Sequence, residues 1–192
     1  MELLLNTEND KKGWLCVYKD FKVNKDFAWD LELVTEPPIV VYGKQCVQHR
    51  CVGFYSDTSS GYKFSGQTTS VKPMTYELKI IMNNVNEKLG TDFNGILINK
   101  YRNREDNIGK HSDNEDGLSK VKPCVASLSF GATRTVRIRD KVSGKIVLDY
   151  PHKEGELLVM FGNFQKHYMH EIPKQLKVWK PRISLTFRNH TQ

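Results

Sequence analysis

The chain has 192 residues, of which 39% are hydrophobic and 27% charged, which predicts one globular domain with a sizeable core. No apolar run approaches the roughly 18 residues of a membrane span, and the run at residues 3–5 is too short for a signal peptide. The net charge of +7 favours a polyanionic partner such as nucleic acid, although a solvated basic surface carries the same signature.

The absence of a leader predicts an intracellular protein, either nuclear or cytoplasmic. In a reducing compartment its four cysteines, none of them in a Cys-x-x-Cys pair, are expected to be free thiols.

The N-terminal part of the chain, residues 1–35, is mixed and polar, with scattered aromatic residues. Residues 1–35 are expected to form an extension packed on a domain that spans residues 36–192. Pro37-Pro38 breaks the chain. The β-branched run at 39–42 that follows suits a short strand ending at Gly43.

The clearest helix is predicted over residues 73–89. Leu78, Ile81 and Val85 recur at spacings of three and four, which places them on one helix face. Pro73 suits the first helical position and Gly90 suits the stop.

From residue 93 onward the pattern is one short β-rich run after another, separated by turn-forming residues. The expected strands are 95–101, 124–130, 135–139, 145–150, 156–161 and 183–188. Many short strands with turns between them predict a sandwich or closed barrel. The expected class is mainly β with flanking helices (α+β), and a jelly roll meets that description.

A possible metal site begins at His111-Ser112-Asp113. On an extended backbone two residues that are two apart point to the same face, and a distant histidine could complete a facial triad. His167 and His170 both qualify as that third ligand. Two histidines, one carboxylate and open positions fit non-haem iron(II), although any single histidine is more often an ordinary hydrogen-bonded residue.

The run at 183–188, with the preceding arginine, adds a second signal. Ile183, Leu185 and Phe187 would face the core, leaving two arginines, Arg182 and Arg188, with Ser184 and Thr186 on the other face. Buried arginines need anionic partners, and a dicarboxylate co-substrate would supply two. The alternative is a solvent-facing charged strand.

A polar pair, Asn99 and Tyr101, shares a strand face with Leu97 and could contact the same ligand. An ordinary polar strand end would look the same.

Together these segments resemble the signature of the AlkB family of iron(II)- and 2-oxoglutarate-dependent dioxygenases. The matching motifs are Asn99-Lys100-Tyr101, His111-Ser112-Asp113-Asn114-Glu115, Ser127-Leu128-Ser129-Phe130-Gly131, His170 and the run from Arg182 to Arg188. The resemblance covers roughly residues 35–190. It implies a double-stranded β-helix (jelly roll) over about 93–190 and a substrate lid over about 39–70. It also implies oxidation of alkyl groups on nucleic-acid bases, with 2-oxoglutarate and O2 as co-substrates.

The resemblance also assigns roles to individual residues. His111, Asp113 and His170 would be the iron ligands, because His170, unlike His167, has the family's spacing to the arginine strand. Arg188 is expected at the distal carboxylate of 2-oxoglutarate and Arg182 near its iron-side carboxylate. The other expected contacts of 2-oxoglutarate are Asn99, Tyr101 and Thr186.

The lid resembles that of the duplex-DNA-preferring nuclear branch of the family in animals. Val41-Tyr42-Gly43 would form an apolar finger that fills the gap left by a flipped base. The other expected substrate contacts are Lys44, Arg50, Tyr55, Asp57, Asn114 and Glu115. Phosphate contacts are expected from the basic residues Lys44, Arg50, Lys63, Lys100, Arg102, Arg104 and Lys110.

The expected function is therefore DNA alkylation repair, on substrates such as 1-methyladenine and 3-methylcytosine. Alternatives are an RNA substrate, a protein side chain, or a nucleic-acid-binding protein without turnover. The expected partner is nucleic acid, with DNA favoured over RNA, and no membrane. A monomer is expected because enzymes of this family act as monomers.

Overall fold

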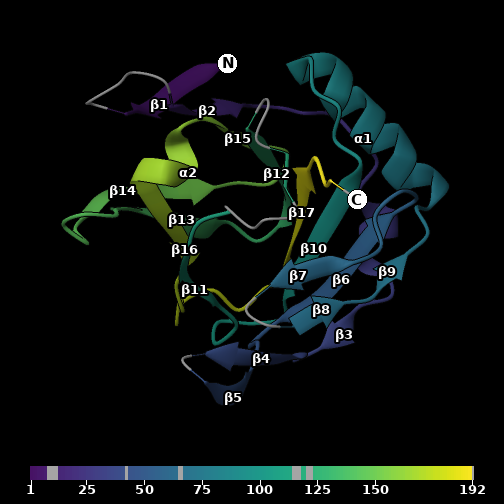
Figure 1. Cartoon of the computed structure of the whole chain (residues 1–192), viewed down its shortest axis with the longest axis horizontal. Helices are drawn as coiled ribbons and strands as arrows, with labels where there is room; N and C mark the ends of the chain where they lie inside the picture. The colour runs from purple at the N-terminus through teal and green to yellow at the C-terminus, as the bar shows by residue number, and fades with distance from the viewer. Residues whose placement is uncertain (8–12, 42, 65–66, 114–117, 120–122, 192) are drawn as a thin grey trace.

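The computed structural model describes residues 1–7, 13–41, 43–64, 67–113, 118–119 and 123–191 (Figure 1). The strands are β1 Glu2–Asn6, β2 Gly13–Tyr18, β3 Val34–Thr35, β4 Pro38–Val41, β5 Lys44–Val47, β6 Cys51–Ser56, β7 Tyr62–Phe64, β8 Gln67–Thr69, β9 Val71–Lys72, β10 Gly95–Tyr101, β11 Ile108–His111, β12 Cys124–Gly131, β13 Arg134–Asp140, β14 Ile146–His152, β15 Leu157–Gly162, β16 Tyr168–Ile172 and β17 Arg182–Arg188. The helices are α1 Tyr76–Leu89, α2 Phe164–His167 and a 3-10 turn at Asp26–Trp29.

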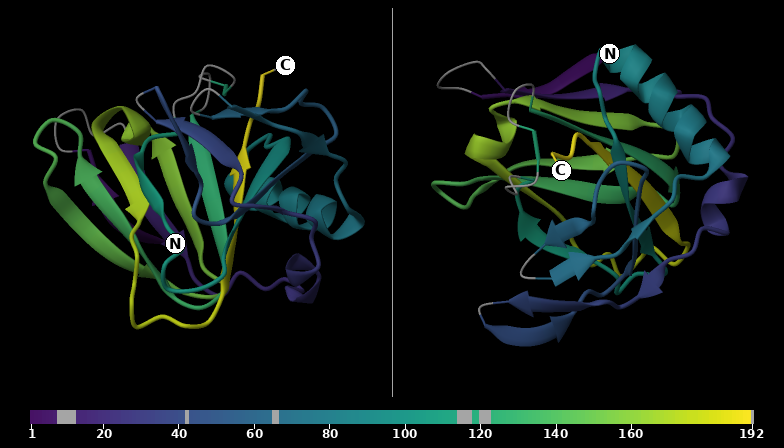
Figure 2. Two further views of the ribbon diagram at one scale, coloured as in Figure 1. Left: turned by 90° about the horizontal axis from the view of Figure 1, so that it is seen from below. Right: turned by 45° about the vertical axis from the view of Figure 1, so that its right-hand side comes forward.

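Two sheets lie face to face. The larger runs β1-β2-β15-β12-β17-β10-β6-β3, with β9 parallel to β6, and the smaller runs β11-β16-β13-β14. The hairpins β4–β5 and β7–β8 lie beside the sandwich (Figure 1). Figure 2 (left) shows the connection from β16 to β17 at one end of the sandwich and the C-terminus at the other. The mainly β fold and its two largely antiparallel sheets confirm the predicted jelly roll.

Alternation along the strands of the large sheet divides the core in two. On the outer face Leu128, Leu185 and Phe187 pack with Leu78 and Ile81 of α1, and Figure 1 shows α1 lying across that face. The inward residues of the same strands join a second cluster between the sheets, which includes Leu15, Tyr101, Val136, Leu158 and Met160. The predicted orientation of β17 is confirmed, since its apolar residues face α1 and its polar ones the interior.

The helix begins later than predicted. Thr75, not Pro73, sets its start, because the Thr75 side chain accepts a hydrogen bond from Leu78 N at 3.3 Å. Gly90 ends the helix with φ of 63°, as predicted, and its left-handed backbone explains why glycine stands there.

The N-terminal segment differs more from expectation. Residues 1–35 are not only an extension packed on the domain, because β2 pairs with β15 and β1 with β2, so this segment extends the large sheet. The six residues of β6 are all buried, and without a polar–apolar alternation that strand was not predicted. The four cysteines carry free thiols, and within the described ranges no helix is long and apolar enough to cross a membrane.

Candidate metal and co-substrate site

A cavity lies between the two sheets and is lined by their inward side chains. Its walls include Leu97, Asn99 and Tyr101 of β10, Val136 of β13, Leu158 and Met160 of β15, His170 and Ile172 of β16, and Arg182, Ser184, Thr186 and Arg188 of β17. The polar strand faces predicted from the sequence therefore converge on one space.

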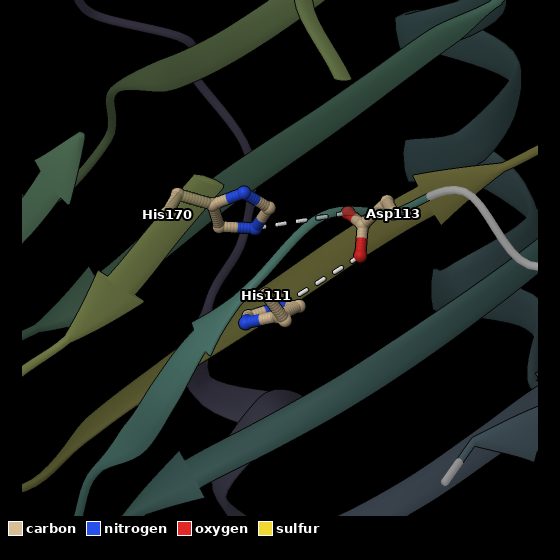
Figure 3. Close-up of side chains that lie close together, drawn as sticks. All are labelled: His111, Asp113 and His170. Carbon is tan, nitrogen blue, oxygen red and sulfur yellow. Dashed lines mark ion pairs between the residues drawn. The ribbon is translucent and has the colours of Figure 1, made fainter. Parts of the chain in front are cut away.

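Three metal-ligating side chains meet in this cavity (Figure 3). His111 ends β11 and pairs in register with His170 of β16, which places the two rings 4.3 Å apart. Asp113 follows β11 by two residues, and one ligand atom from each of the three lies within 4.8 Å of the others. The structure brings His170, not His167, into the group.

The ionisation states of the three suit metal binding. Burial lowers the pKa of His111, and burial together with the neighbouring His111 lowers the pKa of His170 to about 3. Burial alone would raise the pKa of Asp113, but Arg188, His170 and His111 hold it well below its usual range. At neutral pH the site therefore offers two neutral imidazoles and one carboxylate, which is the form that binds metal.

Backbone and side-chain contacts orient these donors. His111 Nδ1 lies 2.8 Å from Gly109 O, and a carbonyl can only accept, so Nε2 keeps its lone pair for a metal. Asp113 N donates to Gln165 Oε1 at 3.0 Å, and Ser112 Oγ donates to Tyr168 O at 2.7 Å. Sequence reasoning missed Gln165, since no spacing pattern marks it.

Three buried arginines surround the cavity. Arg188 Nη2 donates to Asp113 Oδ1 at 2.6 Å, and Arg50 Nε donates to Asn99 Oδ1 at 2.6 Å. Arg182 lies at the opposite end of β17 from Arg188. Among the described lining residues the only carboxylate is Asp113. With neutral histidines, the described lining of the cavity holds three arginines and one carboxylate, which suits an anionic ligand.

Comparison with known proteins accounts for this geometry. The family model "2OG-Fe(II) oxygenase superfamily" matches residues 31–188. Mouse "DNA oxidative demethylase ALKBH2" is 36% identical over 178 residues, covering 87% of this chain and 73% of that protein. The chain belongs to the AlkB family of 2-oxoglutarate- and iron(II)-dependent oxygenases.

Other AlkB-family proteins give a consistent result. Human "DNA oxidative demethylase ALKBH2" is 39% identical over 78% of this chain, and human "Alpha-ketoglutarate-dependent dioxygenase alkB homolog 3" is 34% identical over 91%. The chain spans only 60% and 65% of their respective lengths. A solved structure described as "The structure of OsALKBH1" shares the fold, with a TM-score of 0.64 at 14% identity, over 91% of this chain and 97% of that one.

The family's iron(II) fits the residues present. Two histidines and a carboxylate form the donor set that non-haem iron(II) takes. Two of their buried polar atoms, Asp113 Oδ2 and His170 Nδ1, have no hydrogen-bond partner among the described residues. The family's 2-oxoglutarate, a dianion, fits the three arginines that line the same cavity.

The two arginines of β17 stand in the opposite order to the one predicted from the sequence. Arg188 was expected at the distal carboxylate, but it contacts the triad residue Asp113. Arg182, expected on the iron side, opens β17 six positions earlier, which at about 3.3 Å per residue is roughly 20 Å away along the strand. A sequence alignment matches positions but does not say which end of a strand faces the metal.

Several expected AlkB substrate contacts have structural roles instead. Tyr55 is 4% exposed, and its hydroxyl donates to Glu32 O at 3.0 Å. Asp57 accepts from Met74 N at 2.9 Å and pairs with Lys79, which fixes the start of α1. The Tyr55 side chain is therefore not available to a substrate, and the exposed Asp57 carboxylate is already paired.

Arg50 also departs from its expected role as a phosphate contact. It is 4% exposed, donates to Asn99 and to Gln48 Oε1 at 2.6 Å, and lines the cavity. Its side chain therefore forms part of the cavity wall.

Other expected contacts fall on the lid or outside the described residues. Val41 is 41% exposed at the end of β4, and Gly43 and Lys44 continue into β5. Tyr42, Asn114 and Glu115 lie outside the described residues.

Of the expected phosphate contacts, Lys44 and Lys110 are exposed. Arg102 instead pairs with Asp106 and Glu36, Lys100 lies over the ring of Trp29, and Arg104 stacks on Trp179.

Proposed function

We propose that this protein removes alkyl groups from nucleic-acid bases by oxidation, using iron(II), 2-oxoglutarate and O2 and releasing an aldehyde, succinate and CO2. The observation that carries the proposal is the meeting of a His-Asp-His donor set and three buried arginines in one cavity. Relatives described as DNA oxidative demethylases support a base in DNA as substrate and DNA repair inside the cell as the setting.

In this proposal His111, Asp113 and His170 hold iron(II), which supplies the activation of O2 needed to oxidise an alkyl carbon. Arg188 lies at the triad end of the cavity and binds the iron-side carboxylate of 2-oxoglutarate, and Asn99, which pairs in register with Ser184, lies between the two ends. Arg182 and Tyr101 lie at the other end and bind its distal carboxylate, with Thr186 between. Arginine suits this role because its planar fork matches a carboxylate.

A groove next to the cavity provides a path for the base. It lies between the β4–β5 hairpin and β11 and is lined by Ile39, Val41, Cys46, Lys110 and His111, among others. The groove and the cavity share Gln48, Arg50, Ile108 and His111 in their walls. A base flipped out of its helix would enter through the groove and present its alkyl group at the triad. The exposed Lys44 and Lys110 suit phosphate binding at its rim.

Turnover tests the proposal. The protein is incubated aerobically with iron(II), 2-oxoglutarate and oligonucleotides that contain 1-methyladenine or 3-methylcytosine, and both succinate and repaired base are measured. His170→Ala should abolish both products, and His167→Ala, three positions away but outside the donor group, should not. Absence of succinate and repaired base with the unaltered protein would refute the proposal. DNA binding that is independent of iron, without turnover, would instead support a binding protein.

The preferred nucleic acid is a finer part of the proposal. We propose DNA over RNA, and duplex DNA in particular, because of the lid motif Val41-Tyr42-Gly43. Rates on matched duplex DNA, single-stranded DNA and RNA decide between these substrates. Tyr42→Ala should reduce the rate on duplex DNA more than the rate on single-stranded DNA. Equal losses would contradict the proposal that Val41-Tyr42-Gly43 fills the gap left by a flipped base.

A further inference from the structure

The surroundings of Arg182 are unusual for a buried arginine. It is 1% exposed, its Nε donates to Ser129 Oγ at 2.9 Å and its Nη2 donates to His152 Nδ1 at 3.0 Å. The ring of Tyr101 lies 5.4 Å from its Cζ. None of these partners carries a negative charge at neutral pH. Nη1 has no hydrogen-bond partner among the described residues, so the guanidinium is held in place but not neutralised.

A second buried arginine shows the contrast. Arg134 is 0% exposed, and it donates to four acceptors: Asn103 O, Asp106 O, Pro173 O and Gln175 Oε1. All three guanidinium nitrogens of Arg134 therefore donate to acceptors of the protein itself. Arg182 is held through Nε and Nη2 only, and its Nη1 has no hydrogen-bond partner among the described residues.

His152 accepts the hydrogen bond from Arg182 Nη2. It is 0% exposed and ends β14. Its Nε2 lies 2.9 Å from Glu156 O, and since a carbonyl can only accept, Nε2 carries the proton. Nδ1 therefore keeps the lone pair that accepts from Arg182. Burial, and then the charge of Arg182, lowers the pKa of His152 to about 3, so the imidazole is neutral at neutral pH.

We propose that His152 is a positioning residue that orients Arg182 for the distal carboxylate of the co-substrate. A neutral acceptor fixes the guanidinium without cancelling its charge, whereas a carboxylate at this place would occupy and neutralise it. His152 thereby favours 2-oxo acids that carry a second carboxylate over those that do not. This inference rests on the proposed function, and it concerns a residue outside the metal and substrate motifs.

Binding to the Mn(II)-loaded protein, measured by calorimetry, tests the inference with two ligands. 2-Oxoglutarate has the distal carboxylate, and 2-oxobutyrate has the same 2-oxo acid end without it. His152→Leu should weaken 2-oxoglutarate binding by about tenfold to a hundredfold, the range for a lost hydrogen bond to a charged group. The affinity for 2-oxobutyrate should stay the same. In turnover, KM for 2-oxoglutarate should rise while kcat at saturation changes little.

Three further variants complete the experiment. His152→Asn places an amide oxygen near the position of Nδ1 and should restore much of the affinity. His152→Glu should weaken 2-oxoglutarate binding most, because its carboxylate would neutralise Arg182. This variant also tests the role of His152 if the leucine variant does not fold. Tyr150→Phe is the matched control. It removes a neighbouring contact of β14, the hydroxyl bond to Glu156 Oε2 at 2.9 Å, and should leave binding of both ligands unchanged.

The outcomes separate the two proposals. If the unaltered protein does not bind 2-oxoglutarate, the proposed function fails. If it binds 2-oxoglutarate and a folded His152 variant binds it equally well, the role of His152 is refuted. Equal weakening of 2-oxoglutarate and 2-oxobutyrate would also refute it, because the damage would then not be specific to the distal carboxylate.

Discussion

Gln165→Ala is expected to weaken metal binding without unfolding the protein. Gln165 is 7% exposed, and its Oε1 accepts from the backbone N of Asp113 at 3.0 Å. Its own backbone O is held by Lys141 Nζ at 2.6 Å, and its Nε2 lies 3.0 Å from Met160 Sδ. The residue therefore ties the segment that carries Asp113 to the sandwich, although it offers no ligand to the metal.

The size of the effect follows from these contacts. A buried backbone donor that loses its partner costs about 1–3 kcal/mol. Without metal the Asp113 segment can shift and regain a hydrogen bond, but with metal it must return to its place. Most of the free-energy cost of the lost hydrogen bond therefore appears as weaker metal binding. At about 1.4 kcal/mol per factor of ten, this predicts a loss of metal affinity of about 10-fold to 100-fold, the range typical of residues that orient metal ligands.

Titration of the metal-free protein with Mn(II), followed by the signal of free Mn(II) in electron paramagnetic resonance, measures the affinity. Gln175→Ala is a matched control. Its Oε1 also accepts from a backbone amide, Thr135 N at 2.8 Å, on β13. That variant should lose stability and keep its metal affinity. If Gln165→Ala binds Mn(II) as tightly as the unaltered protein, the proposed tie to Asp113 is wrong.

Three other changes test the fold. Thr75→Ala removes the N-cap of α1 and should lower the free energy of unfolding by about 1 kcal/mol in a urea titration; no change would show that the cap contributes nothing. Leu128→Ala empties a fully buried site beneath α1 and should cost about 2–5 kcal/mol in the same assay. The pKa of His152 is lowered from 6.5 to about 3 in the folded protein. Between about pH 3 and pH 6.5 the folded state therefore binds fewer protons than the unfolded state. Its contribution to the free energy of unfolding is complete above about pH 6.5 and falls on acidification towards pH 3. The loss of stability between about pH 7.5 and about pH 4.5 should be smaller in His152→Leu, and an equal loss would contradict this assignment.

Much of the fold was predictable because its strands carry clear patterns. The alternation in β17 placed Leu185 on the helix side and Arg182 on the cavity side, and both positions are confirmed. The spacing of His111 and Asp113 likewise predicted a shared site. Such patterns are local consequences of strand geometry, so a sequence shows them directly.

The rest depends on contacts that no local pattern records. β2 is far from β15 in the sequence, and their pairing gives no local signal. Gln165 and His152 act through single hydrogen bonds to distant residues. Tyr55 resembled a substrate contact, but its burial against Glu32 O is visible only in the folded chain.

The position of β17 has a consequence for folding. Although it is the last strand described, it lies in the middle of the large sheet, between β12 and β10. Its pairs with β10 join residues as far apart in sequence as Gly95 and Arg188. Such non-local topology predicts slow, cooperative folding. Until β17 is inserted, β10 and β12 expose unpaired edges that favour aggregation. Pairing of β17 therefore supplies the central strand, the two cavity arginines and the protection of these edges together.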